Sequence, residues 1–182
     1  MSLKIRRALI LGGANCVWDD VEAACKLGKF QAIVAVNDVG AEYPEHVDIW
    51  CSLHPDKLPA WAKQREDNGY KPAGMLVGHA DKKSAGFLDE TTPYQWPGMS
   101  GSGSSGLFAV KVALEHGYNR VVLCGVPMEK RPHFFKKEPW PQVDSFTAAW
   151  KTSINNYSEF TRSMSGWTAE LLGKPTKKWL AG

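Results

Sequence analysis

Glycine and serine alone make up residues 100–106, and this run is the strongest candidate for a binding site in the sequence. It opens a segment that predicts an amphipathic helix over residues 107–116. The first amide groups of a helix have no partner within it, and serine hydroxyls cap this end, so several N–H donors and the positive end of the helix dipole converge on one spot. The sequence therefore predicts that Ser104, Ser105 and Gly106 bind an anion; the alternative is a flexible loop that ends in an ordinary serine cap.

Glycine and small polar residues also follow the short apolar runs of the chain. This second set of candidate binding residues consists of Gly12, Gly13, Asn15, Asn37, Asp38 and Gly125. Glycine removes side-chain bulk, so a backbone can approach a phosphate or a ribose, while the alternative for each residue is an ordinary turn former. Neither the G-x-G-x-x-G dinucleotide fingerprint nor the G-x-x-x-x-G-K-[ST] phosphate loop occurs. An NAD dehydrogenase is therefore poorly supported, although Asp38 stands about where such folds keep a ribose-binding acid.

Three histidines are placed to exchange protons with a ligand near neutral pH. His54 and His79 follow apolar runs and His133 lies in a long loop; His133 and His54 are the predicted catalytic residues. The alternative for each is a solvated or hydrogen-bonded loop histidine. None of the five histidines has the H-x-x-x-H or H-E-x-x-H spacing of metal ligands, so the sequence predicts no metal site.

Two long loops are expected, over residues 80–102 and 126–143. Connections of this length in a compact domain are more often functional than idle. The second loop contains a basic and aromatic segment, residues 128–137, that predicts a lid over an anionic ligand. The alternative is a solvated loop with an aromatic anchor.

Short apolar runs alternate with helical segments along the chain. Strands are predicted at residues 7–11, 32–36, 47–53, 73–77 and 121–124, with a short last strand at 160–164, and helices at 18–27, 58–67, 107–116 and 145–157. This alternation is typical of a doubly wound, Rossmann-like α/β fold, with one mainly parallel sheet and helices on both faces. Because right-handed crossovers bring the C-terminal ends of parallel strands to one edge, the candidate residues are expected to converge there.

Length and composition fit one globular domain over residues 1–182, with the tail 167–182 packing on it. Lys and Arg (22) exceed Asp and Glu (19) by three, a surplus too small to predict nucleic-acid binding. No apolar run approaches the ~20 residues of a membrane span and no signal peptide precedes the first strand, so a cytoplasmic protein is expected. The cysteines are spread singly, which predicts reduced core residues at Cys16, Cys25, Cys51 and Cys124.

One segment resembles a known family. The stretch GSGSSGLFAVKVALEHGYNRVVLCGVPM, residues 101–128, is similar to a segment of bacterial sialyltransferases that use CMP-sialic acid, with a Ser-Ser-Gly opening, an alanine-containing helix, Gly-Tyr and an apolar strand ending in Gly. LGGANCVWDDVE, residues 11–22, resembles the glycine turn of that family and of the related archaeal-type hydroxymethylpterin diphosphokinase-like proteins, with Gly13-Ala14-Asn15 in place of Gly-Pro-Ser. Pro127 stands where the family has an acid after the strand's glycine.

The resemblance implies a nucleotide held by Asn15, Asn37, Ser105 and Gly106, with His133 the nearest counterpart of the family's loop histidine. It implies a protein that transfers a group from a nucleotide-activated sugar, with CMP or UDP as the bound nucleotide. Two alternatives stay open: a non-catalytic nucleotide-binding or accessory protein, and an ATP-dependent pterin diphosphokinase-like enzyme with Mg²⁺ held by Asp38 or Asp81. The expected partner is a small-molecule nucleotide or nucleotide sugar, with a homo-oligomer left open and neither nucleic acid nor a membrane span expected.

Overall fold

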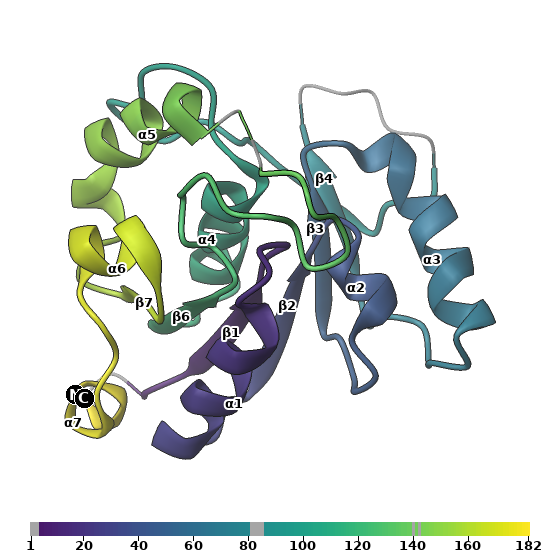
Figure 1. Ribbon diagram of the computed structural model, residues 1–182, viewed down its shortest axis with the longest axis horizontal. Helices are drawn as coiled ribbons and strands as arrows, with labels where there is room; N and C mark the ends of the chain where they lie inside the picture. The colour runs from purple at the N-terminus through teal and green to yellow at the C-terminus, as the bar shows by residue number, and fades with distance from the viewer. Residues whose placement is uncertain (1–3, 81–85, 140, 142) are drawn as a thin grey trace.

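The computed structural model describes residues 4–80, 86–139, 141 and 143–182, and these fold around one parallel β-sheet (Figure 1). Its strands lie in the order β5-β4-β3-β2-β1-β6-β7, and each pairs in parallel with its neighbours. They are β1 (Arg7–Leu11), β2 (Ala32–Val36), β3 (Ile49–Ser52), β4 (Leu76–His79), β5 (Glu90–Thr92), β6 (Arg120–Cys124) and β7 (Thr161–Ser163). The sheet winds outward from β1 in both directions, which confirms the predicted α/β Rossmann-like class and puts the reversal of strand order between β1 and β6.

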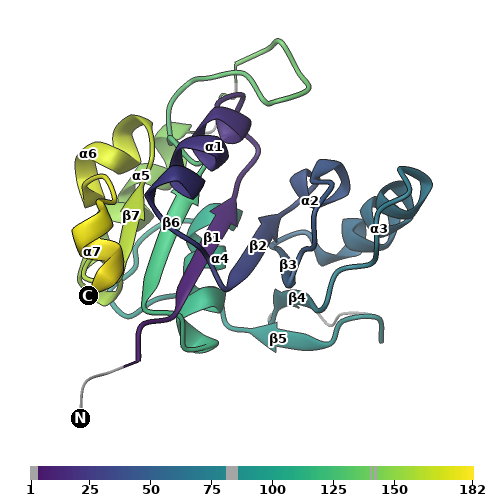
Figure 2. The same cartoon turned by 90° about the horizontal axis from the view of Figure 1, so that it is seen from below.

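Helices cover both faces of the sheet. They are α1 (Val17–Leu27), α2 (Val39–Glu42), α3 (Leu58–Asp67), α4 (Ser105–Glu115), α5 (Val143–Thr152), α6 (Gly166–Leu172) and α7 (Lys177–Ala181), with short 3₁₀ turns at Pro55–Lys57 and Ile154–Asn156. Helices α1, α2 and α3 lie on one face and α4 on the other (Figure 2). Across the described ranges, none of these helices combines the length and the apolar composition that a membrane crossing requires.

The strands are uniformly apolar because both sides of the sheet are covered. In β1, Ala8 and Ile10 belong to the core cluster on the α4 side, whereas Leu9 and Leu11 belong to the cluster on the α1 side. All four side chains are fully buried. Successive strand residues point to opposite faces, so a strand buried on both faces shows no polar alternation.

The long loop predicted over residues 80–102 contains a strand that the sequence analysis did not predict. The three residues of β5 pair with β4 at the edge of the sheet. Only Thr92 of this strand is fully buried, and its hydroxyl donates to Glu115 Oε2 at 2.9 Å. An edge strand this short needs no apolar run, so its pattern resembles a loop.

The C-terminal third also differs in its boundaries. The helix predicted over residues 145–157 begins at Val143 and ends at Thr152, because the Ser153 hydroxyl bonds back to the Ala149 carbonyl at 2.7 Å and a 3₁₀ turn follows. The tail forms α6 and α7. Leu180 of α7 is 2% exposed, and its carbonyl accepts a hydrogen bond from the Arg7 guanidinium.

The prediction of core cysteines is correct for only part of the set. Cys51 and Cys124 are fully buried, and burial raises the pKa of both thiols. Cys25 is exposed and Cys16 is half-buried. Both lie on or next to α1, where only one helix face meets the sheet, so a cysteine there is not bound to be internal.

A buried arginine holds α2 in position. Arg65 of α3 is 1% exposed, and its guanidinium donates to the carbonyls of Gly40, Tyr43, Glu45 and Lys71. Gly40 lies in the four-residue helix α2, and the other three carbonyls lie in irregular segments. Helix or sheet hydrogen bonds therefore do not supply these carbonyls with backbone donors. The arginine therefore replaces the backbone partners that this region lacks.

We predict that Arg65→Met lowers the free energy of unfolding by about 3 kcal/mol or more, because several buried carbonyls lose their donor at about 1–3 kcal/mol each. Lys63→Met is the matched control on the same helix, since Lys63 pairs with Asp67 at the surface and exposed pairs contribute little. Urea denaturation of both variants measures the difference. Equal midpoints would contradict the role assigned to Arg65.

Candidate functional site

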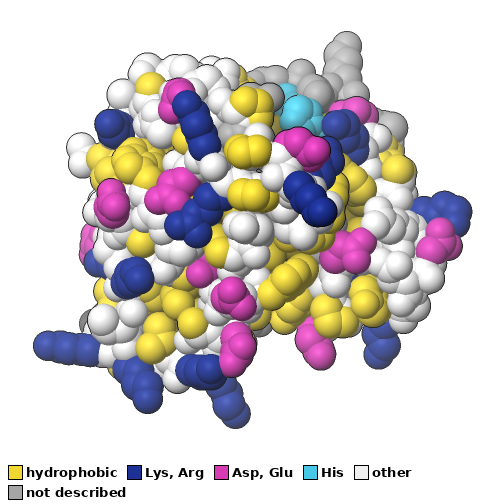
Figure 3. All heavy atoms as spheres, viewed as in Figure 1, with side chains coloured by type: hydrophobic (Ala, Val, Ile, Leu, Met, Phe, Trp, Pro, Cys, Tyr) yellow, Lys and Arg dark blue, Asp and Glu magenta, His cyan; other side chains and the backbone are white. Residues whose placement is uncertain are grey.

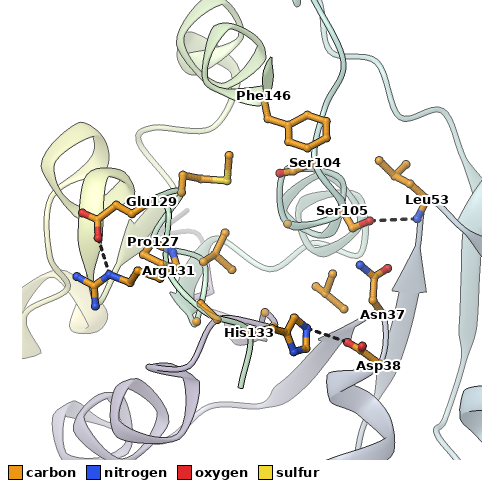
Figure 4. A pocket seen from close by; sticks show the side chains of 18 of the residues that line it. Asn37, Asp38, Leu53, Ser104, Ser105, Pro127, Glu129, Arg131, His133 and Phe146 are labelled. Atoms are coloured by element: carbon orange, nitrogen blue, oxygen red, sulfur yellow. Dashed lines mark hydrogen bonds and ion pairs between the residues drawn. The ribbon is translucent and has the colours of Figure 1, made fainter. Parts of the chain in front are cut away.

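A cavity with a volume of about 550 Å³ opens at the C-terminal edge of the sheet, where the strand order reverses. Its walls come from the turns after β1, β2, β3 and β6 and from the start of α4 (Figure 4). It brings together nearly all the residues singled out from the sequence: Gly12, Gly13, Asn37, Asp38, His54, Ser104, Ser105, Gly106, Gly125 and His133. Asn15 does not line it; that residue is exposed, and its N–H donates to the Pro132 carbonyl at 3.0 Å.

The N-terminus of α4 presents free donors to this cavity. Ser104 caps the helix: its hydroxyl accepts from the Leu107 N–H at 3.3 Å and from Trp150 Nε1 at 3.1 Å, so it is occupied by the fold. The hydroxyl of Ser105 accepts from the Leu53 N–H at 3.4 Å and keeps its own proton to donate. Within the described part of the chain, the backbone N–H groups of Ser105 and Gly106 have no hydrogen-bond partner. Three donors therefore point from one helix end toward the cavity.

The glycines of the site allow close contacts between backbones. A Cβ on Gly12 would lie 2.5 Å from the Gly125 carbonyl oxygen, and one on Gly106 would lie 2.8 Å from Val126 Cγ1. Gly125 has a φ of +68°, and a Cβ there would lie 2.5 Å from that of Val17. These positions have no room for a side chain, which holds the two turns and the helix end around the cavity.

A buried carboxylate, not predicted from the sequence, fixes the turn after β6. Asp20 of α1 is 8% exposed, and its Oδ2 accepts from the Gly125 N–H at 2.9 Å and from the Ser165 hydroxyl at 2.7 Å. The half-buried Cys16 lies 3.4 Å from that hydroxyl, and burial raises the pKa of its thiol. Asp20 thus ties α1 to the turn after β6 and to the residue before α6.

Asn37 is held so that its amide nitrogen faces the cavity. The His54 N–H donates to Ser52 Oγ at 2.8 Å, and that hydroxyl donates its proton to Asn37 Oδ1 at 2.7 Å. The oxygen of the amide is therefore used by the protein and the two N–H donors remain (Figure 4). Asn37 has a φ of 55°, a left-handed conformation that asparagine tolerates better than most residues, and the Trp50 indole donates to its carbonyl.

Asp38 and His133 form a pair at the edge of the same cavity. His133 Nε2 lies 3.3 Å from Asp38 Oδ1, and the two side chains are 27% and 22% exposed. His133 Nδ1 is buried and has no hydrogen-bond partner among the described residues. We therefore assign the proton of the neutral imidazole to Nε2, where it meets the carboxylate. The Nε2–H therefore points at Asp38, and the carboxylate of Asp38 is the proton acceptor that the pair can offer to a ligand.

The segment predicted as a lid is docked as a wall of the cavity. His133 forms an antiparallel bridge with Ala14, the Phe134 N–H donates to the Gly13 carbonyl at 3.0 Å, and Pro132 accepts from Asn15. The same segment carries Arg131, whose hydrogen bond to Glu129 raises its pKa. Backbone pairing to the β1–α1 turn thus fixes His133 relative to the sheet.

Metal ligands are not gathered at this site. Across the residues that the structure describes, no group of three or more His, Cys, Asp or Glu side chains is placed to hold a metal ion. Asp81, a predicted Mg²⁺ ligand under the diphosphokinase alternative, lies outside the described residues.

Comparison with known proteins found no matching family model, no matching curated protein and no matching solved structure. The resemblance to sialyltransferases therefore rests on the sequence motifs alone.

We predict that Gly13→Ala displaces His133, because the new Cβ would lie 2.3 Å from Nε2. The expected loss of stability is about 1–3 kcal/mol, together with a changed imidazole ¹⁵N NMR spectrum for His133. Gly86→Ala is the control, since a Cβ there meets nothing within 4 Å. An unchanged His133 spectrum in Gly13→Ala would show that this histidine does not sit against the β1–α1 turn.

Proposed function

We propose that this protein binds a nucleotide and transfers the group of a nucleotide-activated sugar to a hydroxyl acceptor. The observation that supports it best is that the free donors of the α4 N-terminus and the Asn37 amide open into the same cavity as the Asp38–His133 pair. The cavity volume of about 550 Å³ lies within the range of small-molecule and cofactor sites.

The phosphate of the nucleotide would bind at the start of α4. The N–H groups of Ser105 and Gly106, the Ser105 hydroxyl and the Asn37 amide all donate, and the helix dipole favours negative charge at this end. Arg131 also lines the cavity, where its guanidinium is paired with the carboxylate of Glu129. This donor set favours an anion over a neutral ligand.

The flat base of the nucleotide would bind at the apolar end of the cavity. Leu53, Met128 and Phe146 line it, and Figure 4 shows Phe146 at the opposite end of the view from His133 and Asp38. A ligand with a flat aromatic base at one end, a phosphate in the middle and a polar reactive group at the other end matches this order of side chains. CMP and UDP are the first candidates, because the sequence motifs resemble those of enzymes that use CMP-sialic acid.

The proposed reaction is a displacement at the anomeric carbon. The acceptor's hydroxyl oxygen forms a bond to that carbon while the bond from the carbon to the phosphate oxygen breaks. The phosphate leaves with the electron pair, and the N–H groups of α4 stabilise its charge. The proton of the hydroxyl passes to the carboxylate of Asp38, which the Nε2–H of His133 holds in position.

The alternatives are less well supported by the cavity. For the diphosphokinase alternative, Mg²⁺ needs free carboxylates, whereas the two carboxylates that line the cavity among the described residues are engaged: Asp38 lies against His133 and Glu129 bonds Arg131. A non-catalytic nucleotide-binding protein would use the same donors without proton transfer. Turnover separates it from the transferase.

We predict that CMP or UDP binds more tightly than NAD or ATP with Mg²⁺ in isothermal titration calorimetry. Ser105→Leu and Asn37→Asp should each weaken binding at least tenfold (about 1.4 kcal/mol), because one fills the space at the helix end and the other replaces N–H donors by a carboxylate. Asn15→Ala should stay within twofold, since Asn15 does not line the cavity. Absence of binding by every nucleotide at millimolar concentration would contradict the proposal.

We predict that His133→Gln lowers turnover of the nucleotide sugar that binds best by about 10²–10⁴-fold, with nucleotide affinity retained. His54→Gln, on the β3 turn, should keep most of the activity, because His54 is not part of the carboxylate pair. Mass spectrometry of the released nucleotide and of the transferred product measures both. Full activity of His133→Gln would remove His133 from the reaction, and a wild type without turnover would favour the non-catalytic alternative.

A further inference from the structure

The hydroxyl proton of Ser104 has no acceptor within the described part of the chain. Ser104 lines the cavity at the start of α4 and is 6% exposed. Its oxygen accepts from the Leu107 N–H at 3.3 Å and from Trp150 Nε1 at 3.1 Å, which uses both lone pairs of a hydroxyl. The fold therefore occupies the oxygen and leaves the proton. A buried donor without an acceptor costs free energy, so this proton marks the place of an acceptor atom of a ligand.

Asn37 and the first amides of α4 are also limited to donation. The Asn37 side-chain oxygen accepts from the Ser52 hydroxyl at 2.7 Å, which leaves the two N–H groups of the amide. The backbone N–H groups of Ser105 and Gly106 have no partner among the described residues. Together with the Ser104 hydroxyl, four groups at this end of the cavity can donate a hydrogen bond and cannot accept one.

The carboxylate and imidazole acceptors of the cavity lie farther from the start of α4. Figure 4 shows Ser104 and Ser105 on this helix, with the Asn37 amide next to Ser105. The Asp38–His133 pair lies beyond Asn37 as seen from the helix. The Ser105 hydroxyl is the exception at the helix end, because its oxygen accepts a single hydrogen bond and keeps one lone pair. A ligand group at the start of α4 therefore meets mainly donors.

The charge of the molecular surface does not select one anion over another of equal charge. In Figure 3, basic and acidic side chains are interspersed over the face of the molecule that is drawn. The guanidinium of Arg131, which lines the cavity, is paired with the carboxylate of Glu129. The choice between such anions therefore depends on the hydrogen bonds that each of them can make.

We propose that the start of α4 binds a phosphate group that carries no proton, and that Trp150 and Ser52 impose this preference as positioning residues. The inference rests on the proposed function and names the bound group as a phosphodiester. The two non-ester oxygens of a phosphodiester only accept hydrogen bonds, whereas the P–O–H group of a protonated monoester must also donate one. Neither Trp150 nor Ser52 lines the cavity; each acts through the side chain whose oxygen it occupies.

Cytidine 5′-monophosphate and its methyl ester are a matched pair of probes for the wild-type protein. At pH 5 both are mainly monoanions, because the second pKa of a phosphate monoester is about 6, and they differ in one P–O–H group. By isothermal titration calorimetry we expect the methyl ester to bind at least tenfold more tightly at pH 5. At pH 8 the monophosphate has lost this proton and should bind at least as tightly as the methyl ester.

The ratio of the two affinities at one pH is the quantity that tests the inference. The titratable or charged side chains that line the cavity among the described residues are Asp38, His54, Glu129, Arg131 and His133. They face both probes under the same conditions, so their own titration cancels in the ratio.

Trp150→Phe removes the indole N–H and so frees a lone pair of Ser104 to accept from a protonated phosphate. The preference at pH 5 should fall at least threefold, with the affinity for the methyl ester retained. Ser52→Ala lets the Asn37 amide turn its oxygen toward the cavity and should lower the preference independently, which keeps the test decisive if Trp150→Phe does not fold. Tyr157→Phe is the matched control: it removes a hydroxyl that bonds the Trp150 carbonyl at 2.5 Å and leaves the indole in place, so the preference should not change.

The outcomes separate this inference from the proposed function. Nucleotide binding with equal affinities for the two probes at pH 5 overturns the inference alone. A preference that survives unchanged in both Trp150→Phe and Ser52→Ala also overturns it, because these residues would then not impose the selectivity. Selectivity at pH 5 without turnover of any nucleotide sugar overturns the proposed transfer and supports the phosphate preference. Absence of binding by both probes at millimolar concentration at pH 8 overturns both.

Discussion

The close approach of the turns after β1 and β6 is the contact on which the site depends. The Gly12 N–H donates to the Cys124 carbonyl at 2.8 Å, and the space between Gly12 and Gly125 is too small for a Cβ on either. The carboxylate of Asp20 fixes the turn after β6 by accepting a hydrogen bond from the Gly125 N–H. Because strand order reverses at this point, the crossovers on either side diverge and leave a cavity that α4 borders. The free amides of α4 face that cavity because Val126 packs against Gly106.

The fold was predictable because its strands are buried on both faces. Uniformly apolar runs with helical segments between them have few solutions other than a doubly wound parallel sheet. What failed was local: β5 has only one fully buried residue, Thr92, and α2 is four residues long, so neither produces a periodic pattern. The ends of α5 depend on hydroxyl groups such as that of Ser153, whose bonding choice is settled by the surrounding structure.

The site was predictable at the level of the sheet edge, and less so at the level of single side chains. Residues that follow parallel strands meet at one edge whatever their identity, which is why Gly12, Asn37 and Gly125 line one cavity. Asn15 has the same sequence neighbourhood, but the bridge between Ala14 and His133 leaves it exposed. Asp20 gave no signal, because a carboxylate in the first turn of a helix is ordinarily solvated and only its partners after folding explain its burial.

The division between the buried and exposed parts of this edge has a consequence for specificity. Asn37 is held by a chain of hydrogen bonds through Ser52 and cannot change without disturbing β3. Phe135 is 54% exposed, and the contacts of its ring in the described part of the chain are with the rings of His133 and Phe134 and with Lys136, so a substitution there costs little stability. A substitution at Phe135 can therefore change this exposed aromatic surface without disturbing the N–H donors at the start of α4. His133 belongs to the same segment as Phe135 and also pairs with Asp38, so it links the exposed aromatic surface to the more buried part of the site.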